Sequence, residues 1–343
     1  MLMLNKVFVD EKSIDKYSDS KTLADRTRAL LKYQIETWEL ARQGYNLLDS
    51  VEVKIFEFDD FEIKVQFNPG RIVSSSAKVD KDSISARPCF LCYKNLPEEQ
   101  KAIPYFRDYL ILANPYPIFP EHFTIPKIDH VKQQIEGNIE GMLNLSYDIG
   151  KYYTVFYNGP QCGASAPDHM HFQAGLKNFM PIDTEYKKLI SDNSDILQET
   201  DEVRIWGVKN NLRRFFIIES SNKKKLIKGF RKIYDVLHSL NAHSETEPMM
   251  NILSYYDDKK WKLIIFPRTK HRPDHFFREG DKNILLSPAA VDFGGVCITP
   301  REQDFNKLTK DILIEIFRQV SIPEEIYEYY NKTLMREISS SQS

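Results

Sequence analysis

The chain has 343 residues, of which 42% are hydrophobic and 28% charged, so it can form a large buried core and is not a disordered protein. A formal net charge of −2 argues against broad attraction to nucleic acid or to membranes. The sequence shows no signal-peptide core and no run approaching the roughly 20 apolar residues of a membrane span. The four cysteines, two of them in a CxxC pair, suit a reducing compartment, and we expect a cytoplasmic protein.

The first half of the chain contains both helical and extended segments. Apolar residues at helical spacing predict one helix over residues 20–48, with an end near Gly44, and another over residues 131–150. Residues 51–67 alternate apolar and polar side chains on both sides of an Asp pair, which is typical of a hairpin. The remaining predicted elements are a Ser-rich loop at residues 68–85 and strands at residues 109–113, 122–126 and 152–157.

The second half repeats this plan after a polar stretch at residues 181–202, which we interpret as a connector. Its predicted elements are strands at residues 203–208, 213–219, 250–256, 260–267 and 296–300 and helices at residues 224–240 and 304–320. Each half thus combines several strands with a long helix, and IPKIDH in the first half is echoed by FPRTKHRP in the second. We interpret this pattern as a divergent duplication that divides the chain into residues 1–180 and 203–343.

The segment PDHMHFQAG places polar side chains at alternate positions of a predicted strand. His169, His171 and Gln173 would share one face, because successive side chains of a strand point to opposite sides. A neutral imidazole is a good nucleophile toward phosphorus. The alternative for an isolated HxH pair is two histidines whose hydrogen bonds are satisfied within the fold.

The loop NGPQCGASAP, residues 158–167, precedes this row and favours the chemical interpretation. Gly159 and Gly163 would let the backbone approach a phosphate closely. Backbone N–H groups from Asn158 onward, the Ser165 hydroxyl and the Gln173 amide are donors suited to the charge that develops on an attacked phosphate. We therefore predict a phosphate site beside His171.

A second group of residues is suited to a metal ion. Cys89 and Cys92 form the CxxC pair, and His130 and His169 lie on two other segments. Two thiolates and two imidazoles are a sufficient ligand set for tetrahedral zinc, which would brace the fold and would need no open coordination position. The alternative is a pair of buried cysteines beside two hydrogen-bonded histidines.

A basic segment and two smaller features complete the candidate sites. The basic side chains of FPRTKHRP could neutralise a polyphosphate or a phosphorylated acceptor, and they are Arg268, Lys270, His271 and Arg272. A solvated charge run after a strand explains this segment nearly as well. Arg71 could also hold phosphate, and Ser287 with Gly294 and Gly295 forms either a second phosphate loop or a tight turn.

Three stretches together resemble the histidine triad superfamily. They are CFLCYKN at residues 89–95, NPYPIFPEHFTIPKIDH at residues 114–130 and NGPQCGASAPDHMHFQ at residues 158–173. HxHxQ, in place of the HxHxHxx of the hydrolases, is similar to the transferase branch, which includes galactose-1-phosphate uridylyltransferase, diadenosine tetraphosphate phosphorylase and GDP-L-galactose phosphorylase. The clear resemblance covers residues 87–173, and a weaker one covers residues 291–305.

The resemblance implies an α+β fold and a set of residue roles. Two histidine-triad-like halves, each an antiparallel sheet with a long helix, would follow an amino-terminal helix. His171 would form a nucleotidyl-histidine, Gln173 would hold a phosphate oxygen, Ser165 would bind phosphate and Asn114 would contact the ribose. His169 would join Cys89, Cys92 and His130 on zinc. The chain departs from the family pattern by the insertion of Asp168 and by one extra residue in PKIDH, and both changes concern the zinc ligands.

The glutamine predicts the type of reaction. An amide cannot supply a proton or activate water at neutral pH, so the covalent nucleotide should survive until phosphate or a sugar phosphate attacks it. We expect a nucleotidyltransferase or phosphorylase that acts on a nucleoside-diphosphate sugar or a dinucleoside polyphosphate, and a homodimer is compatible with this interpretation. The alternatives are a nucleotide hydrolase, a nucleotide-binding protein without turnover, and an interaction module stabilised by zinc.

Overall fold

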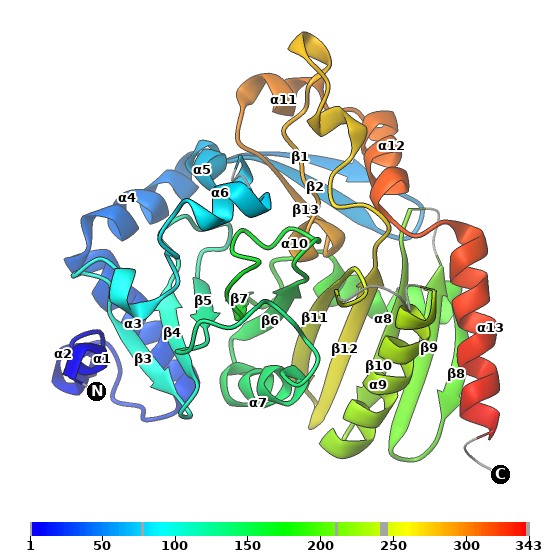
Figure 1. The fold of residues 1–343 in the computed structure, drawn as a ribbon, viewed down its shortest axis with the longest axis horizontal. Coiled ribbons are helices and arrows are strands. Elements are labelled where there is room, and N and C mark those ends of the chain that lie inside the picture. Colours follow the sequence, from blue (N-terminus) through cyan, green and yellow to red (C-terminus); the bar gives the residue numbers. More distant parts are fainter. Residues whose placement is uncertain (1, 77–78, 210–211, 241–245, 341–343) are drawn as a thin grey trace.

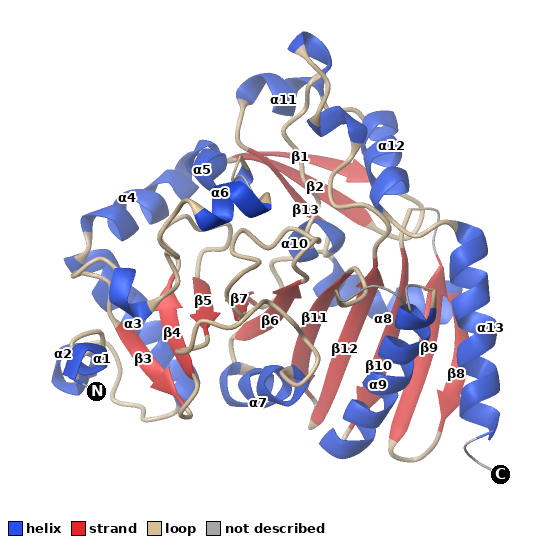
Figure 2. Ribbon diagram, viewed as in Figure 1, coloured by secondary structure: helices blue, strands red, loops and turns tan. Residues whose placement is uncertain are grey.

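One ten-stranded antiparallel sheet crosses the molecule and contains strands from both halves of the chain (Figures 1 and 2). The computed structural model describes residues 2–76, 79–209, 212–240 and 246–340. In sheet order, the strands of the first half are β3 (Ala102–Tyr105), β4 (Tyr109–Ala113), β5 (His122–Pro126), β7 (His171–Leu176) and β6 (Tyr153–Asn158). Those of the second half follow as β11 (Met250–Asp257), β12 (Lys260–Pro267), β10 (Arg214–Ser220), β9 (Val203–Lys209) and β8 (Ser194–Glu199).

The two halves meet where β6 pairs with β11, with Asn158 opposite Asn251. Each half contributes a run of antiparallel strands and a helix, α7 (Ile139–Ile149) in the first and α9 (Lys223–Ser239) in the second. The predicted α+β fold of two related halves is therefore confirmed, and the structure adds that their sheets are continuous. The domain boundaries themselves stay a prediction.

Helices cover one face of the large sheet and bury the largest apolar core. α3 (Leu23–Thr37), α7, α9 and α13 (Glu324–Ser340) pack there against alternate strand residues. On β7, Phe172 and Ala174 point into this core. His171 and Gln173 therefore face the other side of the sheet, as the alternation predicts.

A smaller sheet on the other face ties together segments from opposite ends of the chain. β1 (Glu52–Glu57) and β2 (Glu62–Phe67) form the predicted hairpin, and β13 (Val296–Thr299) pairs parallel with β2. A second apolar core joins this sheet to α8 (Ile182–Asn193), α10 (Ala290–Phe293) and α12 (Lys310–Val320). β13 belongs to the second half of the sequence but pairs with β2 of the first half. The chain therefore crosses back to the first half before β13.

The remaining helical segments are short. The helices are α1 (Leu2–Asn5), α2 (Glu11–Asp15), α4 (Glu39–Leu47), α5 (Ile72–Ser75), α6 (Lys81–Ser85) and α11 (Glu302–Lys307). The 3₁₀ turns are η1 (Leu48–Ser50), η2 (Pro69–Arg71), η3 (Tyr93–Asn95), η4 (Asp274–Phe276) and η5 (Gly280–Lys282). Among the helices of the described ranges, none has the length and apolar character needed to cross a membrane.

The amino-terminal helix predicted over residues 20–48 is divided. Trp38 has an extended backbone that ends α3 and precedes α4. Gly44 lies inside α4 and not at its end. A glycine is needed there because α4 packs closely on the loop after β4. A Cβ at position 44 would lie 2.0 Å from the carbonyl oxygen of Pro115, which only glycine avoids.

Other predicted boundaries also change. The helix expected over residues 131–150 begins only at Ile139. The helix expected over residues 304–320 divides at Leu308, after which Thr309 caps α12. The stretch 68–85, expected as a loop, contains α5 and α6. The stretch 181–202, expected as a connector, contains α8 and the edge strand β8.

Candidate active site

A cavity of about 500 Å³ lies between the polar row of β7 and segments of the second half. Its polar lining includes most of the residues that the sequence indicated, three of them from the second half. These residues are Arg71, Asn114, Asn158, Gly163, Ser165, His171, Gln173, His271, Arg272 and Ser287. Its apolar lining includes Trp38, Val73, Phe90 and Leu91.

His171 is held as a neutral ring with a defined tautomer. Its Nδ1 lies 2.8 Å from the carbonyl oxygen of His169, which can only accept, so Nδ1 carries the proton and Nε2 carries the lone pair. The side chain is buried, and burial lowers its pKa to about 4. The imidazole is therefore neutral at neutral pH, with Nε2 unprotonated, as a nucleophile requires.

Gln173 follows on the same face of β7, and a residue that the sequence analysis missed contacts it. His122 of β5 places its Nε2 3.1 Å from Gln173 Oε1. Residues 122 and 124 of β5 share a face, and Thr124 pairs with Gln173, but this pairing joins two strands and is not visible in the sequence of either one.

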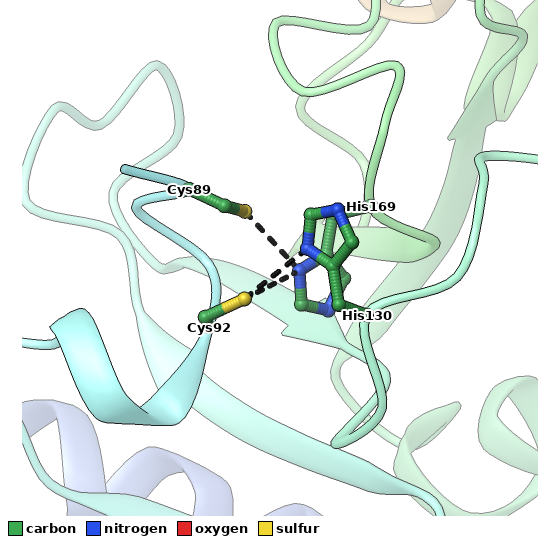
Figure 3. A group of neighbouring side chains, drawn as sticks. All are labelled: Cys89, Cys92, His130 and His169. Carbon is green, nitrogen blue, oxygen red and sulfur yellow. Dashed lines mark hydrogen bonds between the residues drawn. The ribbon is translucent and has the colours of Figure 1, made fainter. Parts of the chain in front are cut away.

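His169 does not extend the row of His171 and Gln173. It precedes β7 and turns its ring toward Cys89, with 3.2 Å between Cys89 Sγ and His169 Nδ1 (Figure 3). On its other side, His169 Nε2 donates to the carbonyl oxygen of Lys127 at 2.8 Å. That hydrogen bond leaves the lone pair of Nδ1 directed at the cysteines.

The four predicted metal ligands converge. Cys92 Sγ lies 3.2 Å from His130 Nδ1 and 3.6 Å from His169 Nδ1. One ligand atom from each of Cys89, Cys92, His130 and His169 lies within 4.8 Å of all the others. The donor set and spacing fit a tetrahedral ion, and the Lys127 carbonyl provides the outer hydrogen bond typical of a ligating histidine.

The departures from the family pattern do not separate these ligands. The inserted Asp168 places Oδ2 3.5 Å from His130 Nε2, where it could orient the ring. His130 is partly exposed, whereas His169 is fully buried. The cluster therefore has one outer and one inner histidine.

The loop at residues 158–167, which the sequence predicts to bind phosphate, is fixed in place by contacts with the second half. Asn158 Oδ1 accepts from the Ala290 N–H at 2.9 Å and from Asn251 Nδ2 at 2.8 Å, so this side chain anchors the loop. Gly163 has a φ of +95°, and a Cβ there would lie 2.6 Å from the Ala289 Cβ. Both features exclude other residues at position 163.

Two further residues that the sequence indicated, Ser165 and Asn114, line the same cavity. The Ser165 carbonyl accepts from Arg87 Nη2 at 2.7 Å, and its residue lines the cavity. Asn114 donates from Nδ2 to Thr124 Oγ1 at 3.1 Å and accepts at Oδ1 from the Tyr116 N–H at 2.9 Å. The amide of Asn114 is thus already oriented before any ligand binds.

Family models match both halves of the chain. DUF4922, a domain of unknown function, matches residues 30–176. The GDPGP1-like, C-terminal domain matches residues 188–341. The curated proteins contain no match to this sequence.

Solved structures of the yeast Ap4A phosphorylase Apa2 share the architecture. The structure of Apa2 gives a TM-score of 0.53 at 16% identity, over 85% of this chain and 98% of Apa2. The complex with AMP gives 0.56 at 17% identity, over 86% and 97% of the two chains. The complex with Ap4A gives 0.51 at 16% identity, over 85% and 97%. This chain has the fold of the Apa2 structures, and its second half matches the GDPGP1-like domain. The resemblance predicted from the sequence is confirmed.

In this fold, the basic segment after β12 divides into two parts. Arg268 is buried and does not line the cavity, because its guanidinium is fully used inside the fold. It donates to Asn251 Oδ1 and to the carbonyl oxygens of Val320, Pro288, Lys270 and His271. Lys270 is not among the described residues that line the cavity, and it pairs with Asp274. The sequence predicted phosphate contacts for Arg268 and Lys270, but neither side chain lines the cavity.

The next two residues, His271 and Arg272, reach the cavity instead. Burial lowers the pKa of His271 to about 4, so it is neutral. Arg272 lies over the Phe276 ring at 4.1 Å and remains a cation at the cavity wall. Arg71 approaches from the first half, with Nη1 donating to the Tyr116 carbonyl at 2.6 Å. Arginines from both halves thus line the cavity that contains His171.

Proposed function

We propose that the protein is a nucleotidyltransferase or phosphorylase that works through a covalent nucleotidyl-histidine at His171. Its substrate would be a nucleoside-diphosphate sugar or a dinucleoside polyphosphate. The observation that carries the proposal is the His171 ring, which is neutral, lines a nucleotide-sized cavity and has its Nδ1 proton bound to the His169 carbonyl. The GDPGP1-like match and the likeness to a phosphorylase solved with AMP and with Ap4A support the same class.

In the first step, the Nε2 lone pair of His171 attacks the α-phosphorus. A P–N bond forms, the bond between phosphorus and the bridging oxygen breaks, and the remainder of the substrate leaves as a phosphate. The ring becomes cationic, and the Nδ1–H bond to the His169 carbonyl stabilises that charge. Charge that develops on the phosphoryl oxygens is met by the Gln173 amide and by donors of the loop at Ser165.

In the second step, an oxygen of the acceptor attacks the same phosphorus. The P–N bond breaks, the electron pair returns to Nε2, and His171 is neutral again. Gln173 cannot take a proton from water, so an acceptor that is already an anion is favoured over water. Inorganic phosphate or a sugar phosphate meets that condition, and Arg71 and Arg272 would hold its charge in the cavity.

We further propose that Cys89, Cys92, His130 and His169 bind zinc. When bound, the ion would neutralise the thiolates and brace the CxxC turn against the segment before β7, with no role in the transfer itself. The connection to chemistry passes through His169, whose ring belongs to the cluster and whose carbonyl holds His171 Nδ1. A rigid cluster therefore keeps the nucleophile aimed.

The experiment is label transfer from substrates that carry a radioactive α-phosphate. A panel of Ap4A, GDP-sugars and UDP-sugars is incubated with the wild-type protein, with His171→Ala and with His238→Ala, a histidine of α9 outside the cavity. We expect an acid-labile protein adduct in the wild type and His238→Ala, and none in His171→Ala. An adduct that persists in His171→Ala would refute the mechanism.

The product pattern separates the alternatives. With inorganic phosphate present, a phosphorylase releases a nucleoside diphosphate, whereas a hydrolase releases a nucleoside monophosphate without any acceptor. Tight binding of one substrate of the panel, with neither adduct nor product, would instead identify a binding protein. Release of a nucleoside monophosphate without any acceptor would contradict the role proposed for the amide at position 173.

A further inference from the structure

His122 occupies the interior of the sheet beside the cavity, without lining it. Its side chain is fully buried and packs against the rings of Phe119 and Phe156, with centroid distances of 5.3 and 5.9 Å. Tyr45 of α4 fixes the backbone, because its hydroxyl donates to the His122 carbonyl at 2.9 Å and accepts from the His122 N–H at 3.2 Å. His122 is not among the described residues that line the cavity.

The contacts of His122 determine which ring nitrogen carries the proton. The backbone N–H of Ile118 lies 3.2 Å from Nδ1, and an N–H can only donate. Nδ1 is therefore an acceptor, and the proton of the neutral ring lies on Nε2. Burial lowers the pKa of His122 to about 3, which excludes a second proton at neutral pH.

That tautomer in turn determines how the Gln173 amide is oriented. His122 Nε2–H points at the end of the Gln173 side chain, at 3.1 Å from Oε1. With the amide reversed, two N–H groups would face each other and the buried imidazole donor would have no acceptor. The amide oxygen of Gln173 therefore faces His122, and its NH₂ group is directed away from that ring.

We propose that His122 is a positioning residue that fixes the Gln173 amide so that it offers donors, and not its oxygen, to a phosphate in the cavity. The inference rests on the proposed function, since it assigns Gln173 to a phosphoryl group. A phosphate presents only acceptors, so an oxygen in the place of the NH₂ group would repel it. The Ile118 N–H thus determines the tautomer of His122, and that tautomer determines which end of the Gln173 amide faces the substrate.

Two substitutions of His122 test this role. His122→Phe keeps an aromatic ring against Phe119 and Phe156 and removes the donor, whereas His122→Gln keeps an N–H near the position of Nε2. The variants are measured with the best substrate of the wild-type enzyme. We expect His122→Phe to lower kcat by about tenfold to a hundredfold, with a much smaller change in KM. His122→Gln should recover a large part of that loss.

A double-mutant cycle separates positioning from general damage. In a Gln173→Ala background, His122→Phe should cost almost nothing further, because the amide that it orients is gone. His275→Phe is the matched control, since His275 is also buried but lies outside the cavity lining. It should lower thermal stability about as much as His122→Phe and leave kcat unchanged. Equal and additive losses from His122→Phe in both backgrounds would overturn the proposal.

Proton–nitrogen NMR of the ligand-free protein tests the same claim without any turnover. We expect the His122 resonances to belong to the Nε2–H tautomer, with an unprotonated Nδ1 that accepts a hydrogen bond. Finding the proton on Nδ1 would overturn the proposal even in a fully active enzyme. Finding it on Nε2 in a protein without transfer activity would uphold the amide orientation and reject the proposed function alone.

Discussion

Gln133 holds the backbone of His171 on both sides. Its Oε1 accepts from the His171 N–H at 2.8 Å, and its Nε2 donates to the His171 carbonyl at 3.1 Å. The same Nε2 donates to the Asn158 carbonyl at 2.9 Å. The last paired residues of β6 and β7 are Phe156 and Gln173, so beyond them one side-chain amide replaces the strand ladder. Because Gln133 takes the place of the ladder, the loop at residues 158–167 can diverge from β7 while His171 stays fixed.

Replacing Gln133 with Met should therefore weaken both folding and chemistry. The side chain is buried, and Met would leave the His171 N–H and carbonyl without these partners. We expect the free energy of unfolding to fall by about 2 kcal/mol or more, since each unpaired buried group costs about 1–3 kcal/mol. Urea unfolding measures this loss, and single-turnover labelling should show slower adduct formation. The exposed neighbour Gln134→Met is the control, and a similar effect there would contradict the argument.

The metal cluster should make the nucleophile depend on zinc. Elemental analysis of the purified protein should find one zinc ion per chain, and Cys89→Ser should lose it. Because the His169 ring belongs to the cluster and its carbonyl holds His171, we expect Cys89→Ser to melt at a lower temperature and to form adduct at least about tenfold more slowly.

Cys162→Ala is the control for this prediction. Cys162 is buried outside the cluster, so the variant should keep its zinc although it loses some stability. Full adduct formation by a protein that has been stripped of metal would show that the cluster does not support the active site.

The sequence was sufficient for the parts of the site that depend on local order. Alternation along a strand placed His171 and Gln173 on one face, and the structure has both at the cavity. Four potential ligands on three segments indicated a metal cluster, and the structure brings their ligand atoms together. The positions of these side chains agree with the sequence because strand periodicity and ligand chemistry are both visible in a single chain, whereas the bound metal stays a prediction.

The errors came from contacts between distant residues. The stretch 131–138 has apolar residues at helical spacing, yet it forms no helix. The Gln133 N–H donates to the Pro167 carbonyl, and the Ile135 N–H donates to Glu247 Oε2, which lies in the other half. Long-range partners thus satisfy the backbone that helical bonds would otherwise use. His122 was missed for the same reason, since its role depends on Gln173 in another strand.

Arg272 and Lys270 come from one basic segment, but we expect their replacement to change the KM for the acceptor by very different amounts. Arg272 lines the cavity, whereas Lys270 is paired with Asp274 and is not among the described residues that line it. We expect Arg272→Gln to raise the KM for the acceptor phosphate by about tenfold, because it removes a charge-assisted contact. Lys270→Gln should change it by less than about twofold, since an exposed ion pair contributes little. Steady-state kinetics with phosphate varied decide the matter, and equal effects would contradict this assignment.

Glu247 gives the fold a defined dependence on pH. Its carboxylate accepts hydrogen bonds from the Ile135 N–H, at 2.7 Å, and from Tyr157, so it joins the second half to the loop that carries Gln133. Burial raises the pKa of this carboxyl from 4.5 to about 7. The folded state therefore binds a proton more tightly than the unfolded state does.

The sign of the stability change follows from that difference. A raised pKa contributes stability that is present in full below pH 4.5 and is lost as the pH rises toward 7. The loss should be on the order of 2–3 kcal/mol. Glu247→Gln cannot ionise, so wild-type protein should lose stability relative to this variant across that range, as measured by urea unfolding at several pH values. The exposed Glu98→Gln should run parallel to the wild type. A constant difference between wild type and Glu247→Gln at all pH values would mean that Glu247 ionises equally easily in the folded and unfolded chains.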